Sequence, residues 1–306
     1  MTMRPGDEQL SDALPEHGKV MVTIEPKPRD LGDNFMVRRA LPAIEKRMVG
    51  PFIFWDEFGP ARFEAGKGLD VRPHPHIGLA TITYLFDGEI FHRDTLGSAQ
   101  AIRPGDVNWM NAGRGIAHSE RTAAELRASG SPISGIQSWI ALPEAHEESA
   151  PFFAHHDVAA LPALNEGGKH VRVIAGSLYG LTSPVKTFSE IFYAGADLEP
   201  GAALPLDADH EERAVYTVGG EIEIAGDVFG PGKLLVLRSG DPITIRARTS
   251  ARFLLLGGAN LGPRHLWWNF VSSRKERIEQ AKEDWKTGRF GLVPGDDKEF
   301  IPLPER

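Results

Sequence analysis

The stretch HPHIGLATITYLFDGEIFHRDTLGSAQAIRPGDVNWMNAGRGIAHSE, residues 74–120, decides the fold of this chain of 306 residues. Strand-forming runs alternate in it with turn sequences. The runs cover residues 81–86, 89–93, 107–110 and 116–120, and the turns are Asp87-Gly88, 103–106 and the glycine-rich 111–115. Because Asp-Gly between two such runs favours a hairpin, the stretch predicts a compact unit of antiparallel strands.

Two histidine pairs mark the ends of this stretch. His74 and His76 flank Pro75, and His118 precedes Glu120 by two positions. A spacing of two places side chains on the same face of a strand. Two strands of one small barrel can bring the pairs together across the intervening hairpin and turn. The pattern predicts that three imidazoles and one carboxylate bind a single metal ion.

The ligand types narrow the choice of metal. Neutral imidazoles suit Fe, Ni, Cu, Zn and Mn, and one carboxylate adds a hard donor. The chain has no cysteine, which excludes thiolate ligands, disulfides and a Cys nucleophile. Four protein ligands on an octahedral ion leave two positions for water, dioxygen or a chelating substrate. The remaining positive charge favours an anionic oxygen ligand such as an enolate or phenolate.

The amino-acid composition limits the classes of protein to which this chain can belong. Hydrophobic residues make up 41% of the chain, and the 33 Gly and 23 Pro suit many short strands joined by tight turns. The formal net charge of −8 disfavours a nucleic-acid binder. The sequence shows neither a signal-peptide pattern nor a bilayer-spanning run. We therefore expect a soluble cytoplasmic protein that binds neither nucleic acid nor membrane.

Further strand-like runs precede the stretch at 20–24, 35–38 and 52–55, and an internal echo follows it. Residues 216–222 (YTVGGEI) resemble residues 84–90 (YLFDGEI) at an offset of 132. A duplicated β-domain is the economical interpretation. We predict an arm at 1–18, an N-terminal barrel at 19–145, a C-terminal barrel at 146–262 and a tail at 263–306, with the divider inside 142–165.

The second half has no equivalent of the histidine pairs. The offset places Leu206 and Ala208 at the positions of His74 and His76, and it carries His118 and Glu120 to the neighbourhood of Ser250 and Arg252. His210 has no partner at a spacing of two. We predict that the second barrel binds no metal and closes one side of the pocket.

The tail carries a helical pattern. Ile278, Ala281 and Trp285 share one helix face, residues 273–276 (SRKE) have the form of a capping box, and Gly288 is a plausible stop. We expect a helix packed on a barrel as a structural clamp, with Trp267-Trp268 anchoring it.

Other residues carry two interpretations each. His92 can support the site or bond to Asp94 as a structural histidine. Trp109 and Met110 fit core packing better than substrate contact, and Arg114 fits loop hydrogen bonding slightly better than anion binding. His155-His156-Asp157 is a weak candidate for a second metal site, because adjacent side chains on an extended chain point to opposite faces.

The stretch 74–120 resembles the signature of the pirins, a family of the cupin superfamily. The echo at 216–222 and the tail WWNFVSSRKERIEQAKEDWKTGRF, residues 267–290, are similar to the longer bacterial members. The resemblance implies an all-β bicupin, with two antiparallel β-barrels face to face and metal in the N-terminal one. It places the family's ligands at His74, His76, His118 and Glu120.

The resemblance also implies Fe(II) as the metal and, in some members, quercetin 2,3-dioxygenase activity. Glu120 would then act as a ligand and as a catalytic base on an aromatic or enolisable substrate. The alternatives are a redox-sensing regulator that binds a protein partner and a metal-assisted isomerase or hydrolase. We expect a monomer, because a bicupin already pairs two barrels.

Two positions depart from the family pattern. Pirins commonly carry Arg after HPH and Glu three positions later, and this chain has Ile77 and Ala80 there. Ala80 removes a carboxylate that some cupins place near the metal. We therefore expect a more apolar pocket around an intact set of ligands.

Overall fold

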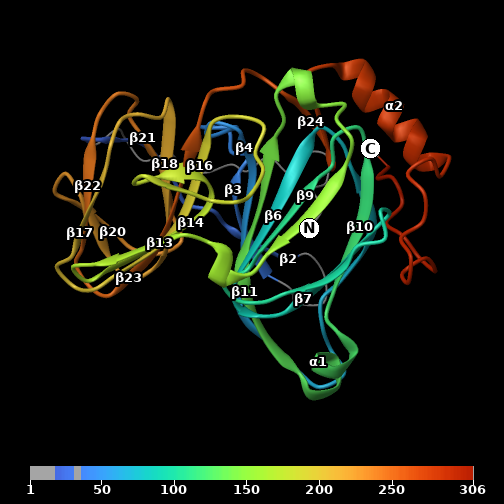
Figure 1. The fold of residues 1–306 in the computed structure, drawn as a ribbon, viewed down its shortest axis with the longest axis horizontal. Helices are drawn as coiled ribbons and strands as arrows, with labels where there is room; N and C mark the ends of the chain where they lie inside the picture. The colour runs from blue at the N-terminus through green and yellow to red at the C-terminus, as the bar shows by residue number, and fades with distance from the viewer. Residues whose placement is uncertain (1–17, 31–35, 306) are drawn as a thin grey trace.

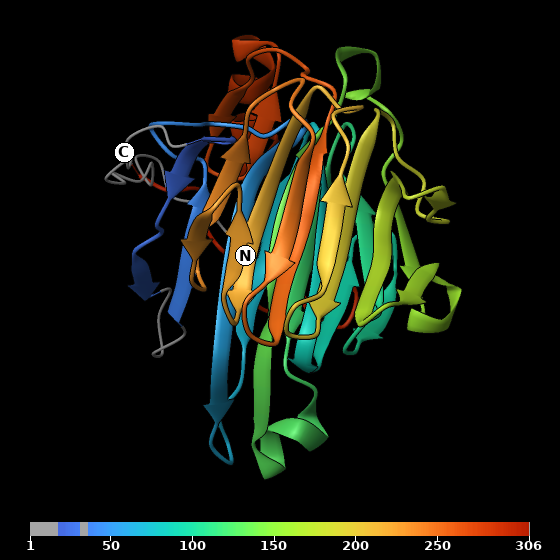
Figure 2. The same ribbon diagram turned by 90° about the vertical axis from the view of Figure 1, so that its left-hand side faces the viewer.

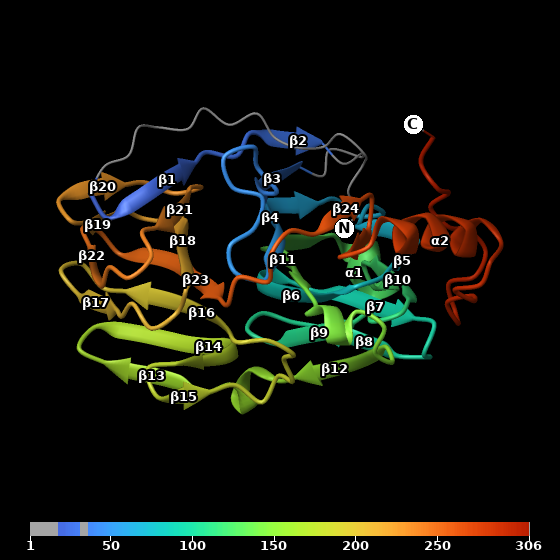
Figure 3. The ribbon, with the colours of Figure 1, turned by 90° about the horizontal axis from the view of Figure 1, so that it is seen from above.

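The computed structural model describes residues 18–30 and 36–305. Strands account for 52% of the described residues and helices for 8%, which confirms the all-β prediction. Each half is a pair of sheets packed face to face rather than a closed barrel. The two halves lie side by side with their larger sheets facing each other (Figure 3). The predicted arm at 1–18 lies, except for Gly18, outside the described residues.

The first half pairs a seven-stranded sheet with a four-stranded one. In spatial order the larger sheet contains β12 (Phe152–His156), β9 (Val107–Asn111), β6 (Leu79–Gly88), β11 (Ser131–Ala141), β4 (Phe52–Phe63), β3 (Met36–Leu41) and β2 (Pro28–Asp30). The smaller sheet contains β5 (Asp70–His76), β10 (Ile116–Arg121), β7 (Ile90–Asp94) and β8 (Ala99–Ile102). The short helix α1 (Ala124–Ser129) joins β10 to β11 (Figure 1).

The second half, which is nearest the viewer in Figure 2, also pairs a larger sheet with a smaller one. Its larger sheet contains β1 (Val20–Ile24), β21 (Leu234–Leu237), β18 (Glu212–Gly219), β23 (Ala251–Gly258), β16 (Ile191–Leu198), β14 (Lys169–Leu178) and β13 (Ala163–Glu166), with β15 (Leu181–Thr182) paired to β14. Its smaller sheet contains β17 (Ala203–Leu206), β22 (Ile243–Ala247), β19 (Ile222–Ile224) and β20 (Asp227–Phe229). The two 3₁₀ turns η1 (Glu144–His146) and η2 (Val158–Ala160) lie between the halves in the chain.

The strand orders of the two halves correspond element by element. The order β9-β6-β11-β4-β3 matches β21-β18-β23-β16-β14, and β5-β10-β7-β8 matches β17-β22-β19-β20. This agreement supports the duplication indicated by the sequence echo. Strand pairing nevertheless crosses the predicted domain ranges, because β1 joins the sheet of the second half and β12 joins that of the first. The ranges 19–145 and 146–262 therefore stay predictions of domain limits.

The hairpin predicted at Asp87-Gly88 is wrong. β6 pairs with β9 and β11, whereas β7 pairs with β8 and β10 in the other sheet. Gly88 has φ +86°, and a Cβ there would lie 2.2 Å from the carbonyl oxygen of Pro132. The short turn therefore serves as a tight corner between two sheets, which only glycine fits. Gly220, its counterpart in the echo, meets the carbonyl of Ser250 in the same way.

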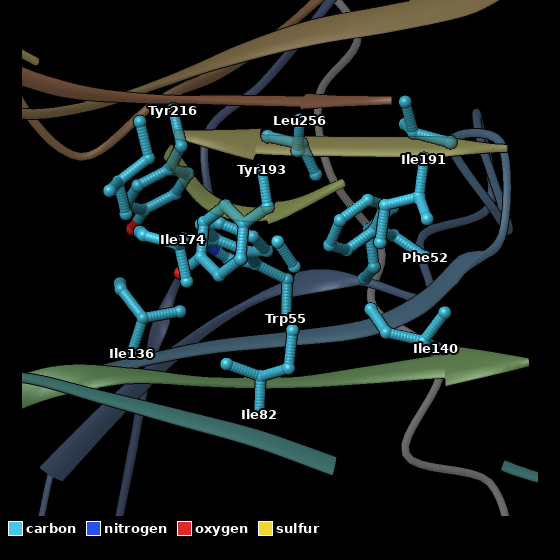
Figure 4. Close-up of a cluster of buried hydrophobic side chains, with 14 of the residues drawn as sticks. Phe52, Trp55, Ile82, Ile136, Ile140, Ile174, Ile191, Tyr193, Tyr216 and Leu256 are labelled. Carbon is cyan, nitrogen blue, oxygen red and sulfur yellow. The ribbon is translucent and has the colours of Figure 1, made fainter. Parts of the chain in front are cut away.

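A central core joins the two larger sheets. Aromatic rings from both halves meet edge to face in it, with centroids 5.4 Å apart for Trp55 and Tyr193 and 5.7 Å apart for Phe52 and Tyr193 (Figure 4). Such contacts add to the hydrophobic gain from burial. The hydroxyl of Tyr216 donates to Glu57 across the interface at 2.7 Å. The large sheet of the first half is thus buried on both faces.

The tail packs on the first half, as predicted. It contains β24 (His265–Trp267), β25 (Phe270–Ser272) and α2 (Lys275–Lys286). Trp268 and the predicted helix face, Ile278, Ala281 and Trp285, share one buried cluster. The capping-box prediction is wrong, because the N-cap is Arg274 and the hydroxyl of Ser273 donates to Glu147 instead. No helix within the described ranges is long and apolar enough to cross a membrane.

Candidate metal centre

The three predicted histidines meet inside the first half. β5 and β10 are neighbouring antiparallel strands, and His74 lies directly opposite His118. His74, His76 and His118 are almost completely buried, at 0%, 0% and 1% exposure. One nitrogen from each ring lies within 4.8 Å of the others, and the Nε2 atoms of His76 and His118 are 3.1 Å apart.

The far nitrogen of two of these rings is held by a backbone carbonyl. His74 Nδ1 donates to Arg72 O at 2.9 Å, and His76 Nδ1 donates to Asn269 O at 3.2 Å. Since a carbonyl only accepts, each Nδ1 carries the hydrogen and each Nε2 keeps its lone pair. His74 Nε2 is buried without a hydrogen-bond partner among the described residues. A buried lone pair of this kind suits a metal ligand.

The far nitrogen of His118 is held by a buried pair. His92 Nδ1 lies 3.4 Å from His118 Nδ1, and His92 Nε2 donates to Asp94 Oδ2 at 2.9 Å. These contacts form a consistent chain of hydrogen bonds when His118 Nδ1 donates to His92 Nδ1. His118 Nε2 then keeps its lone pair. Burial alone would raise the pKa of Asp94, but hydrogen bonds from His92 and Ser98 hold it below its ordinary value. The structure thus shows the bond of His92 to Asp94 and places His92 against His118, and its supporting role in a metal site stays a prediction.

Burial keeps the three imidazoles neutral. It lowers the pKa of His76 to about 3 and that of His74 and His118 well below the ordinary value. Neutral imidazole is the form that binds a metal. The donor set, its burial and the orphaned His74 Nε2 therefore fit a divalent transition metal.

Glu120 lies near this group but outside it. Its side chain is 3% exposed, and its Oε1 lies 3.5 Å from Thr83 Oγ1. The Thr83 hydroxyl is closer to Gln137 Oε1, at 2.8 Å. A bulge interrupts the β5–β10 pairing between His118 and Glu120. Glu120 is not among the three residues whose ligand atoms lie within 4.8 Å of one another, and its role as the fourth ligand stays a prediction.

The other predicted pocket residues lie in different surroundings. Trp109 is buried in the central core between the halves. Met110 is buried in a cluster inside the first half that also contains Trp139. The Arg114 side chain is exposed, while its backbone N–H donates to Ser149 O and its carbonyl accepts from Arg277.

The two departures from the family pattern do not surround the imidazoles. Ile77 packs in the cluster formed with the tail, and Ala80 packs in the central core. The expectation of a more apolar pocket caused by these two residues was therefore wrong. On their strands, they lie out of phase with the inward-facing positions.

Several contacts of the site have no clear sequence signal. The edge of Trp139 packs on His76 at 5.0 Å, and Phe153 stacks on His92 at 4.3 Å. Asn269 contributes only its carbonyl, from a segment 193 positions away in the chain. Backbone acceptors are invisible to a motif search. By contrast, the bond of His92 to Asp94, two positions later, was one of the two interpretations drawn from the sequence, and the structure shows it.

A second group of ligand-type residues lies at the end of β9 and β12. Asp106, His155 and Asp157 have one ligand atom each within 4.8 Å of the others. His155 Nε2 lies 3.2 Å from Asp157 Oδ1 and 3.9 Å from Asp106 Oδ2. His156 is not a member of this group. His210 bonds to Glu190 at 2.8 Å on the second half.

Strand pairing corrects the positions assigned to the second half. Leu206 lies opposite Ile243 just as His74 lies opposite His118. Ile245 lies opposite Ile224 just as Glu120 lies opposite His92. The fixed offset to Ser250 and Arg252 was wrong because the β19–β20 hairpin, residues 222–229, is shorter than the β7–β8 hairpin, residues 90–102. All four counterparts belong to one apolar cluster.

Fold and site together define a bicupin with a candidate metal centre in its first domain. The pirin family model matches residues 34–140, and the model of the pirin C-terminal cupin domain matches residues 193–291. The chain belongs to the pirin family. The resemblance stated from the sequence and the bicupin fold are thereby confirmed.

Relatives extend this assignment. A pirin-like protein of Caulobacter vibrioides is 49% identical, with 93% of this chain and 99% of that protein covered. The crystal structure of a quercetin 2,3-dioxygenase from Acinetobacter baumannii is 33% identical, with TM-score 0.85 and 93% and 95% of the two chains covered. A bacterial pirin of Escherichia coli, solved in complex with nickel(II), shares the fold at 19% identity and TM-score 0.62, with 77% and 96% covered.

Proposed function

We propose that this chain is an Fe(II)-dependent dioxygenase of the quercetinase type. One observation carries the proposal: three buried neutral imidazoles each present Nε2 to one point while Nδ1 is held by a hydrogen bond. The similarity to the Acinetobacter baumannii quercetin 2,3-dioxygenase supports the choice of substrate class. His74, His76 and His118 would hold the ion, with Glu120 as the fourth ligand.

A bound divalent ion would supply Lewis acidity toward an anionic oxygen and, in the case of iron, redox chemistry. The protein itself would fix the orientations of the imidazoles and accept a proton from the substrate hydroxyl. Glu120 is the nearest predicted base for the hydroxyl of an enol or phenol. Its neighbours Thr83 and Gln137 form a buried polar patch beside it. This patch would orient the carboxylate toward a substrate.

The test is aerobic incubation of iron-loaded protein with quercetin while its visible absorption band is followed. We expect loss of the band in wild type and in His210→Ala, whose histidine lies on the second half. His76→Ala should show only the rate of the metal-free control. No loss beyond free iron in solution would refute the quercetinase activity. Metal analysis of freshly purified protein decides between Fe and Ni, Cu, Mn or Zn.

The complete burial of the imidazoles favours a second candidate, a redox-sensing regulator that binds a protein partner. Its metal would respond to oxidants without turning over a bulky substrate. Purified Fe(II) and Fe(III) forms would then differ in their binding to that partner. Equal binding of both forms would reject the switch. Monomeric state and cytoplasmic location stay predictions, which sedimentation and cell fractionation test.

A further inference from the structure

A cleft opens between the two halves, away from the imidazoles. Its volume is about 210 Å³. The first half lines it with residues that include Tyr84, Phe86 and Gly105, and the second half with residues that include Arg172, Gly195 and Arg252. Tyr84 belongs to the central core, on the opposite face of β6 from Thr83. The cleft and the candidate metal centre therefore lie on opposite faces of one sheet.

Missing side chains create the space. Gly195 lies opposite Arg172 on the neighbouring strand, and a Cβ at Gly195 would meet the Tyr84 hydroxyl at 3.7 Å. On the other wall, Gly105 has φ +84°, and a Cβ there would lie 2.7 Å from the Val158 side chain and 3.6 Å from Arg172 Nη1. Gly105 therefore keeps the surroundings of the Arg172 guanidinium open, and Gly195 leaves room beside the Tyr84 hydroxyl.

The charges of the cleft do not balance. Arg252 pairs with Asp197 at 2.7 Å. Arg172 makes no ion pair with any described residue, and its buried Nε has no hydrogen-bond partner there. Arg172 lies close enough to Tyr84 to oppose the rise that burial causes in the pKa of the Tyr84 hydroxyl. The carboxylate of Asp106, the residue after Gly105, accepts hydrogen bonds from the backbone N–H groups of Arg103 and Val158 rather than from Arg172.

Arg172, Arg252 and Tyr84 supply donors to the lining of the cleft, whose one carboxylate, Asp197, is paired with Arg252. Burial raises the pKa of Tyr84, so its hydroxyl keeps a hydrogen to donate. The half-buried Arg172 guanidinium has a donor, Nε, that no described residue uses, and guanidinium matches the planar or tetrahedral oxygens of an oxyanion. His170 bonds to Asn165 and adds no compensating negative charge.

We propose that this cleft binds the carboxylate or phosphate group of a small molecule through Arg172 and Tyr84. A ligand held there would contact both halves of the protein at once. The volume suits a ligand smaller than the drug-sized molecules that fill ordinary pockets of roughly 300–1,000 Å³. The cleft uses no residue of the candidate metal centre, so the proposal is independent of the proposed enzyme activity.

Calorimetric titration with inorganic phosphate and with benzoate, at constant ionic strength, tests the proposal. Binding of either anion supports it and identifies the preferred oxyanion. We expect Arg172→Gln to weaken that binding by roughly tenfold to a hundredfold, since a charge-assisted hydrogen-bond pair is lost. The affinity of Arg172→Lys should lie between those of wild type and Arg172→Gln. Tyr84→Phe should weaken binding by a few-fold.

The matched control is Arg246→Gln, which removes an exposed arginine from β22. It should bind the anion as wild type does. Unchanged metal content and unfolding midpoint in Arg172→Gln would show that the variant is folded. Equal binding by wild type and folded Arg172→Gln, or no heat with either anion, would overturn the proposal.

Discussion

The two halves share one strand order but fill their interiors with opposite chemistry. Between its sheets the first half places His74, His118, Glu120 and His92, all buried. At the counterpart positions the second half places Leu206, Ile243, Ile245 and Ile224, inside an apolar cluster. The same framework therefore supports either a candidate metal centre or an aliphatic core.

This difference shows that burying the polar groups of the site costs folding free energy. Burying an imidazole or a carboxylate without partners is unfavourable, whereas burying an aliphatic side chain stabilises the fold. The first half offsets this cost with hydrogen bonds to every imidazole Nδ1. It also gains support from outside, because its large sheet packs on the second half. The aliphatic half thus acts as a stable platform for the half that carries polar groups.

The largest effect should follow removal of one imidazole. His76→Ala takes away a ligand of the predicted ion and leaves two histidines to hold it. We expect its metal affinity to fall by more than the roughly 10–100-fold typical of losing a supporting contact. Metal content after dialysis, measured by elemental analysis, gives the readout. His210→Ala is the matched control. A loss of metal in that variant would contradict the prediction that only the first half holds the ion.

Truncation of the aliphatic core should act on stability alone. Leu255 is fully buried in the second half, and Leu255→Ala should lower the free energy of unfolding by about 2–5 kcal/mol. Chemical denaturation monitored by tryptophan fluorescence measures the change. At a temperature where the variant is folded, metal content should match wild type. A variant that loses its metal while folded would show that the second half shapes the site.

A smaller effect should follow loss of the contact behind His118. His92→Phe keeps a ring next to Phe153 but removes the acceptor for His118 Nδ1. We expect metal affinity to fall by roughly 10–100-fold, and some stability to be lost because the buried Asp94 Oδ2 loses its donor. Competition with a coloured chelator measures the affinity. Asp94→Asn, which alters the other end of the chain of hydrogen bonds, should shift affinity in the same direction. Wild-type affinity in both variants would reduce His92 to a structural role.

Much of this contrast could be predicted from residues 74–120. Strands, turns and the meeting of three histidines follow from a period of two, because β-geometry is local and repeats along the chain. The sheet to which a strand belongs is not local, so Asp87-Gly88 indicated a hairpin where the chain turns a corner. The counterparts of His118 and Glu120 were misplaced for a similar reason, since loop lengths change between repeats. The carbonyl of Asn269 carries no residue-type signal at all.

The smallest predicted effect concerns the junction between the halves. Tyr216 from the second half donates to Glu57 of the first, and Arg38 also pairs with that carboxylate at 2.8 Å. Because Arg38 stays in place, Tyr216→Phe should lower the free energy of unfolding by only about 1–2 kcal/mol. Metal content should not change. Thermal unfolding followed by calorimetry separates two outcomes. A single transition shifted downward means that the halves unfold together, whereas a new second transition means that this hydrogen bond couples the platform to the site.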